Sequence, residues 1–154
     1  MHGIGKLSRR NFLQSTTSIS AAAFLRLGAP ALAAITQAAC SAKQEAADFL
    51  VLGAVEAADF AAIAARIIPT TATPGATEAG VIYFFDHAFA DAMRSNLDAA
   101  RSGLAEFNLA LAVAGHDGRF DQLSVDEQDN FLRAHETSAF FTLVREMTIF
   151  GFFA

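Results

Sequence analysis

Residues 55–69 read VEAADFAAIAARIIP, and this stretch decides the fold class. Its apolar side chains recur at spacings of three and four, which places Phe60, Ile63 and Ile67 on one face of a helix. Pro69 cannot continue that helix, because it lacks a backbone N–H group and its ring clashes with the preceding turn. The pattern therefore predicts an amphipathic helix that packs one face against a core and ends just before the proline.

Helical spacing recurs along the rest of the chain, whereas strand signals are nearly absent. After a short loop, Thr73 is predicted to cap a second helix with Pro74 at its first position. Two more helices are predicted over residues 95–114 and 137–150, and the sequence from Ser124 to Glu127 is a capping box that begins another. We therefore predict an all-α fold, a small helical bundle of about four to five helices.

The N-terminal segment has the layout of an export signal. Residues 7–14 read LSRRNFLQ and precede an alanine-rich, mildly apolar stretch with no acidic residue. The order resembles a twin-arginine signal and predicts a periplasmic protein. Its motif residues are Ser8, Arg9, Arg10, Phe12 and Leu13. Two fates remain open for the segment: cleavage after the A-x-A sequence that ends at Ala33, and retention as a membrane anchor.

This layout divides the 154 residues into two parts, an export signal and flexible lead-in over 1–39 and a single helical domain over 40–154. The signal contains four of the eleven basic residues and no acidic one, so seven basic and sixteen acidic residues remain, a net charge of −9. A surface of this charge repels nucleic acid and anionic lipid. We therefore expect no nucleic-acid partner, and contact with a membrane only through the signal or through partners.

Cys40 is the single cysteine, which excludes an intrachain disulfide, thiolate zinc clusters and c-type haem attachment. The small residues before it resemble a lipoprotein cleavage site, although Gln37 stands where a bulky apolar residue is expected. Lipidation and an interchain disulfide are the two modifications that the sequence leaves open for this thiol.

Catalytic motifs are missing from the sequence. No nucleophile elbow, phosphate-binding loop, dinucleotide fingerprint or zinc-binding helix pattern occurs, so we predict no catalytic, cofactor-binding or metal-binding residue. A metal-assisted enzyme that uses His87, His116 and His135 is the weaker alternative. Five carboxylates along the first two predicted helices are interpreted as a solvated acidic face: Glu56, Asp59, Glu78, Asp86 and Asp91.

The C-terminal helix is unusually rich in phenylalanine. Fifteen phenylalanines and no tryptophan occur in the chain, and phenylalanine offers apolar area without a polar group. Five of these rings are too many for one stripe of one helix, so they form either a partner interface or the centre of the bundle. They are Phe140, Phe141, Phe150, Phe152 and Phe153.

Several motifs stand in an order that resembles one family. They read ARIIP, TPGATEAGV, GRF, LSVDEQ and GFFA, at residues 65–69, 73–81, 118–120, 123–128 and 151–154. With the twin-arginine leader, they are similar to the gluconate 2-dehydrogenase subunit 3 family over about residues 55–154. Members of that family continue past GFFA with a polar segment containing Y-G-G-N. The stop at Ala154 therefore leaves two interpretations open, a truncated chain whose C-terminal contacts are missing or altered and a tail that docks on another surface.

The resemblance implies a non-catalytic small subunit that binds, stabilises and co-exports a flavin-dependent sugar or sugar-acid dehydrogenase. It implies that FAD and haem c are carried by partner subunits, a flavoprotein large subunit and, in many complexes, a cytochrome c. We expect the partner to contact the tail rings and a loop region that includes Pro69, Pro74, Gly75 and Val81. The alternative is a free-standing periplasmic helical protein or lipoprotein.

Overall fold

The computed structural model describes residues 28–154, and every regular element in that range is helical. The α-helices are α3 (Ala29–Glu45), α4 (Ala54–Ile67), α5 (Ala76–Ala79), α6 (Val81–Ala90), α7 (Leu97–Val113), α8 (Val125–His135) and α9 (Ala139–Phe153). Two short 3-10 helices, η1 (Arg94–Asn96) and η2 (Phe120–Gln122), precede α7 and α8. The predicted all-α fold is confirmed. None of the helices described combines the length and apolar character that a bilayer crossing requires.

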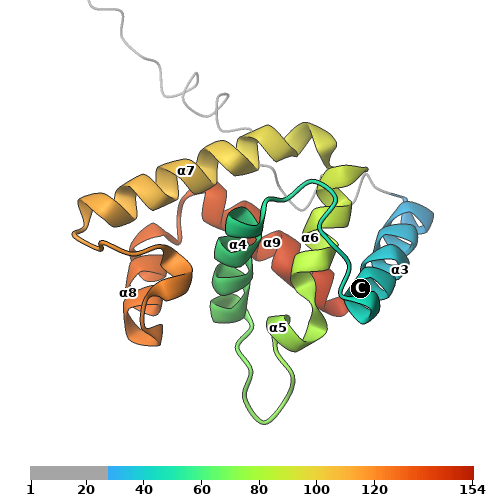
Figure 1. Cartoon of the computed structure of the whole chain (residues 1–154), viewed down its shortest axis with the longest axis horizontal. Helices are drawn as coiled ribbons and strands as arrows, with labels where there is room; N and C mark the ends of the chain where they lie inside the picture. The colour runs from blue at the N-terminus through green and yellow to red at the C-terminus, as the bar shows by residue number, and fades with distance from the viewer. Residues whose placement is uncertain (1–27) are drawn as a thin grey trace, which may run out of the picture.

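Helix α9 lies at the centre of the bundle. It contacts α4, α5, α6 and α7, and it passes behind α4 and α6 in Figure 1. Helix α7 runs along one edge, with α8 and α3 at opposite ends of the molecule (Figure 1). Leu143, Val144 and Met147 of α9 are fully buried, so this helix organises the core around it.

Two groups of aromatic rings fill the core, and one ring of α9 joins them. The centroid of Phe60 on α4 lies 5.8 Å from that of Phe85 on α6. Phe107 on α7 lies 5.0 Å from Phe131 on α8. Phe140 lies 6.1 Å from Phe60 and 5.3 Å from Phe107, and therefore links both groups.

Helix α3 occupies part of the segment that the sequence assigns to a signal and flexible lead-in. It begins at Ala29 with Pro30 in its first turn, packs on α6, and buries Ile35 and Ala39. Residues 29–39 are thus helical here, because these two side chains fill space beside α6. The twin-arginine motif lies outside the described residues, and the division at residue 39 stays a prediction.

The helix predicted to begin at Pro74 begins two residues later, at Ala76. Gly75 is its N-cap residue, and the Gly75 N–H donates to Glu78 Oε2 at 2.9 Å. Gly80 then adopts φ 73°, which favours glycine and separates α5 from α6. The prediction of a Thr73 cap was wrong, because the helix begins at Ala76 and Gly75 therefore occupies the N-cap position.

Candidate partner-binding site

The loop predicted to contact a partner is only partly exposed. Pro69 and Pro74 lie on the surface, whereas Gly75 and Val81 are buried. Val81 is 1 % exposed and belongs to the core. Its predicted contact with a partner is corrected, since its side chain is already covered by the bundle.

The phenylalanine-rich tail belongs mostly to the bundle. Four of its rings are partly buried against the core: Phe140, Phe141, Phe150 and Phe152. Phe153 is 78 % exposed. Four of the five rings thus pack against the core while they keep some exposed surface, and Phe153 faces outward. Their contact with a partner stays a prediction.

The loop before α5 is closed by contacts within the chain. The Ala76 N–H donates to the Ile68 carbonyl at 2.9 Å, and the Thr70 hydroxyl donates to Glu78 Oε2 at 2.6 Å. The Thr70 hydroxyl and the Gly75 amide together hold the pKa of Glu78 below its usual range. Gly75 lies so close to the other side of the loop that a Cβ atom there would be 2.5 Å from the Thr70 nitrogen.

The segment that includes α5 and the C-terminal tail lie close together beside α3. A cavity of about 140 Å³ is lined from the loop side by Ala79 and Gly80, from the tail by Gly151 and Ala154, and from α3 by Cys40 and its neighbours. A Cβ atom on Gly151 would lie 2.8 Å from Phe84 Cδ1, so this glycine lets α9 approach α6 closely.

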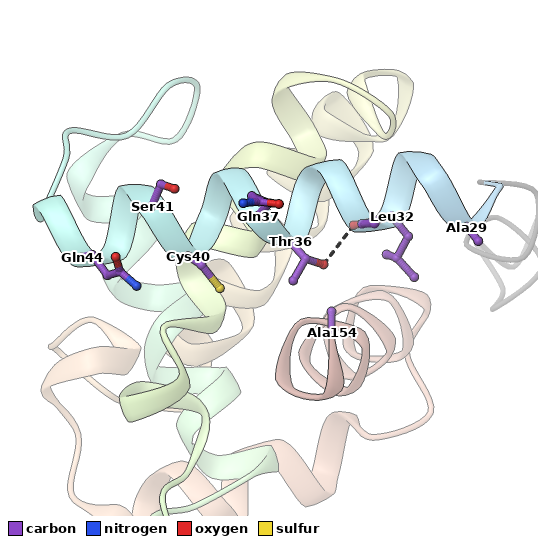
Figure 2. Close-up of a pocket in the computed structure, with 9 residues that line it drawn as sticks. Ala29, Leu32, Thr36, Gln37, Cys40, Ser41, Gln44 and Ala154 are labelled. Carbon is purple, nitrogen blue, oxygen red and sulfur yellow. Dashed lines mark hydrogen bonds between the residues drawn. The ribbon is translucent and has the colours of Figure 1, made fainter.

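A larger groove of about 610 Å³ continues along α3 (Figure 2). Leu32, Thr36 and Cys40 point from α3 toward the side on which Ala154 lies (Figure 2). Cys40 is exposed there and forms no disulfide among residues 28–154. The structure therefore leaves this thiol accessible at the point where the two predicted contact segments converge.

Two acidic residues predicted to be solvated are buried instead. Asp86 is 1 % exposed and accepts hydrogen bonds from the backbone N–H groups of Leu50, Val51 and Leu52 at 2.7, 2.9 and 3.0 Å. Its carboxylate thus fixes the extended segment between α3 and α4 onto α6. The solvated interpretation was wrong for Asp86, since burial is compensated by three backbone donors.

Asp59 is 0 % exposed, and its Oδ2 accepts from Asn108 Nδ2 at 3.1 Å. Its Oδ1 has no hydrogen-bond partner among the described residues. Burial raises the pKa of Asp59, opposed by the Asn108 amide, the Asp121 backbone N–H and the Arg119 charge, while the Asp121 carboxylate adds to the increase. A raised pKa suits acid–base chemistry, but substrate cannot reach a fully buried carboxyl.

We expect Asp59 to make stability depend on pH. Because the folded state binds this proton more tightly than the unfolded state, the contribution is complete below about pH 4, the ordinary carboxyl pKa. It is lost as the pH rises through the raised pKa. The free energy of unfolding, measured in urea over a pH series, should fall less steeply with pH through this range in Asp59→Asn than in the wild type. Asp98→Asn, at an exposed site on α7, should keep the wild-type pH dependence. Equal slopes in wild type and Asp59→Asn would contradict this assignment.

The three histidines of the alternative enzyme hypothesis do not form one site. His135 Nδ1 lies 2.8 Å from the Phe131 carbonyl oxygen, and both His135 and His116 pack against the Phe131 ring. His87 lies on α6. Within residues 28–154, no three side chains of the ligating types converge so that they could hold a metal ion.

A family model described as Gluconate 2-dehydrogenase subunit 3 matches residues 54–154. The chain belongs to that family. Neither the curated proteins nor the solved structures contain a match to it. The family match begins at the first residue of α4 and includes the closed loop and all of α9, so it covers the bundle apart from α3.

The matched part of this subunit 3 chain contains a further groove that its sequence did not reveal. It has a volume of about 340 Å³ and lies between α4, α8 and α9. We call it the arginine groove. Its lining comprises three arginines, two carboxylates and three apolar residues, namely Arg66, Arg133, Arg145, Asp129, Glu136, Ile67, Leu132 and Phe141. The local signal for it is Arg66 and Ile67 within the ARIIP motif, since the other lining residues lie more than 60 positions further along the chain, on α8, at its C-terminal end and on α9.

Proposed function

We propose that this chain is a non-catalytic small subunit that binds, stabilises and co-exports a flavin-dependent sugar or sugar-acid dehydrogenase. In this proposal, FAD and haem c belong to the partner subunits, a flavoprotein large subunit and a cytochrome c. The observation that carries the proposal is the family match over residues 54–154, because the family's name describes one subunit of a dehydrogenase assembly.

The distribution of exposed apolar side chains supports a docking role. Phe153, Leu109 and Val113 are 78, 66 and 81 % exposed, and each offers apolar area without a covering group within the described chain. A partner that covered these side chains would remove their apolar area from water, which favours association. We propose that Pro69, Pro74 and Phe153 form part of the surface that the dehydrogenase covers.

The packing of α3 supports a signal cleavage site that lies ahead of the residues of α3 buried in the bundle. A cut after Ala33 would leave Ile35 and Ala39 in the mature chain, where they are buried against α6. A lipoprotein-type cut before Cys40 would remove both. We therefore propose a periplasmic subunit whose signal ends ahead of the buried part of α3.

The direct test is recovery of the partner. A tagged form of the full chain, purified from periplasm of cells that express it at native level, is expected to carry a flavoprotein with sugar or sugar-acid dehydrogenase activity. Flavin fluorescence and dye reduction of the purified fraction measure this. Recovery of the chain alone, at the same yield and without flavin, would overturn the proposal.

Export of the partner should depend on the twin arginines. The double substitution Arg9→Lys with Arg10→Lys is expected to keep both this chain and the dehydrogenase activity in the cytoplasm, because the export machinery reads the arginine pair. Arg26→Lys, in the same leader, is the matched control and should leave export intact. If dehydrogenase activity still appears in the periplasm while the double variant stays in the cytoplasm, the dehydrogenase is exported without this chain.

A further inference from the structure

The arginine groove concentrates positive charge on an acidic protein. Residues 28–154 contain seven basic and sixteen acidic residues, and three of the seven basic residues line this one groove. With its two carboxylates the groove has a net charge of +1, so the rest of residues 28–154 has −10. A local reversal of sign on a surface with a net negative charge can orient a charged partner.

Only one of the three arginines forms an ion pair within residues 28–154. Arg66 forms a two-point ion pair with Asp129, with Nε–Oδ1 and Nη2–Oδ2 distances of 2.6 and 3.0 Å. Arg133 donates to the neutral side chain of Asn130 at 3.1 Å, and its charge interacts with Asp129 without a hydrogen bond or ion pair between them. Arg145 has no hydrogen-bond or ion-pair partner among residues 28–154. Two guanidinium groups in the groove are therefore available to an external acceptor.

The floor between these charges is apolar. Leu132 is 6 % exposed, and Ile67 and Phe141 are partly buried against the core. A guanidinium fork binds a carboxylate through two parallel hydrogen bonds, and arginine and aromatic side chains are enriched in protein interfaces. The groove thus suits a carboxylate that has an apolar neighbour, rather than a carboxylate alone.

We propose that the arginine groove docks an acidic segment of the partner dehydrogenase subunit, with an aspartate or glutamate carboxylate bound by Arg133 and Arg145 and an adjacent apolar side chain packed on Phe141. This inference rests on the proposed function and names the surface through which it operates. It assigns the groove a protein occupant, because the apolar floor and the pair of forks together match a peptide segment.

The test measures the dissociation constant between the full chain and the purified dehydrogenase large subunit that co-purifies with it. The double substitution Arg133→Glu with Arg145→Glu is expected to weaken binding about tenfold or more and to reduce its dependence on salt. Both side chains are exposed, so an unchanged thermal midpoint will show that the variant is folded. Glu136→Gln, which removes a carboxylate from the same groove, is expected to strengthen binding.

Arg94→Glu is the matched control, because Arg94 is exposed on η1 and donates only to the Ala90 carbonyl of its own turn. It should leave the dissociation constant within about twofold of the wild type. If wild type binds and the groove variant binds equally well, with the same salt dependence, the groove is not the docking surface and the proposed function stands. If the wild-type chain recovers no dehydrogenase subunit, the proposed function fails and this inference fails with it.

Discussion

Replacing Asp86 by asparagine is expected to lower the free energy of unfolding by about 3 kcal/mol. The carboxylate is 1 % exposed and accepts from three successive backbone N–H groups, those of Leu50, Val51 and Leu52. Asparagine retains one acceptor oxygen and turns an NH₂ group toward at least one of these donors. A buried donor then loses its acceptor, and hydrogen bonds to a charged oxygen become weaker bonds to a neutral one.

Denaturant unfolding measures the loss, and amide exchange locates it. The N–H groups of residues 50–52 should lose protection before the rest of the bundle, because their acceptor is the substituted side chain. Asp91→Asn is the matched control, since Asp91 follows α6 and is exposed. It should change stability by no more than about 0.5 kcal/mol. An equally small change for Asp86→Asn would mean that the segment between α3 and α4 does not depend on this carboxylate.

Local features of the fold could be predicted from the sequence. Helix α4 ends at Ile67, just ahead of Pro69. The capping box at Ser124 is present, with the Ser124 N–H donating to Glu127 Oε2 at 2.9 Å and the Glu127 N–H donating to Ser124 Oγ at 3.4 Å. In both cases the interacting groups lie within a few residues of one another, so spacing alone carries the information.

The burial of charged groups could not be predicted in the same way. Asp86 is matched by donors 34 to 36 residues away, and Asp59 by Asn108, 49 residues away. A carboxylate on a helix face is predicted to be solvated unless the distant hydrogen-bond donors that bind it are known. The arginine groove was missed for the same reason, because Arg66 and Asp129 are 63 residues apart and meet only after folding.

In the C-terminal tail, residue type predicts an apolar contact but does not identify the surface contacted. The five phenylalanines could pack on the bundle or on a partner. In the structure α9 lies between other helices, so that Phe140 joins two aromatic groups while Phe153 faces outward. The candidate docking surface therefore had to be assembled from exposure and charge in the folded chain.

Substituting Gly75 by alanine is expected to destabilise the protein by about 3 kcal/mol, through a backbone clash and a weaker N-cap. Its φ of −104° is open to any residue, so the requirement for glycine is spatial. A Cβ atom would lie 2.5 Å from the Thr70 nitrogen, 2.6 Å from the Ile68 oxygen and 2.7 Å from the Pro69 carbonyl carbon. All three are backbone atoms, which cannot move aside as the end of a flexible side chain can.

Gly53 provides the matched control. It is also an N-cap glycine followed at the third helical position by a capping glutamate, Glu56, but a Cβ atom there would lie 3.6 Å from Glu56 Oε2. Gly53→Ala should therefore show only the N-cap effect, about 0.5–1 kcal/mol, in the same denaturant experiment. The difference between the two variants isolates the close approach within the loop.

The pH dependence of the Gly75 variant gives a second readout. The depressed pKa of Glu78 contributes stability that is present above the ordinary carboxyl pKa and is lost as the pH falls through the depressed value. Displacing the Gly75 amide from Glu78 should reduce this loss on acidification. If Gly75→Ala instead keeps wild-type stability and acid response but no longer binds the dehydrogenase subunit, Gly75 is a contact residue. The TPGATEAGV motif would then be required for recognition rather than for closing the loop on itself.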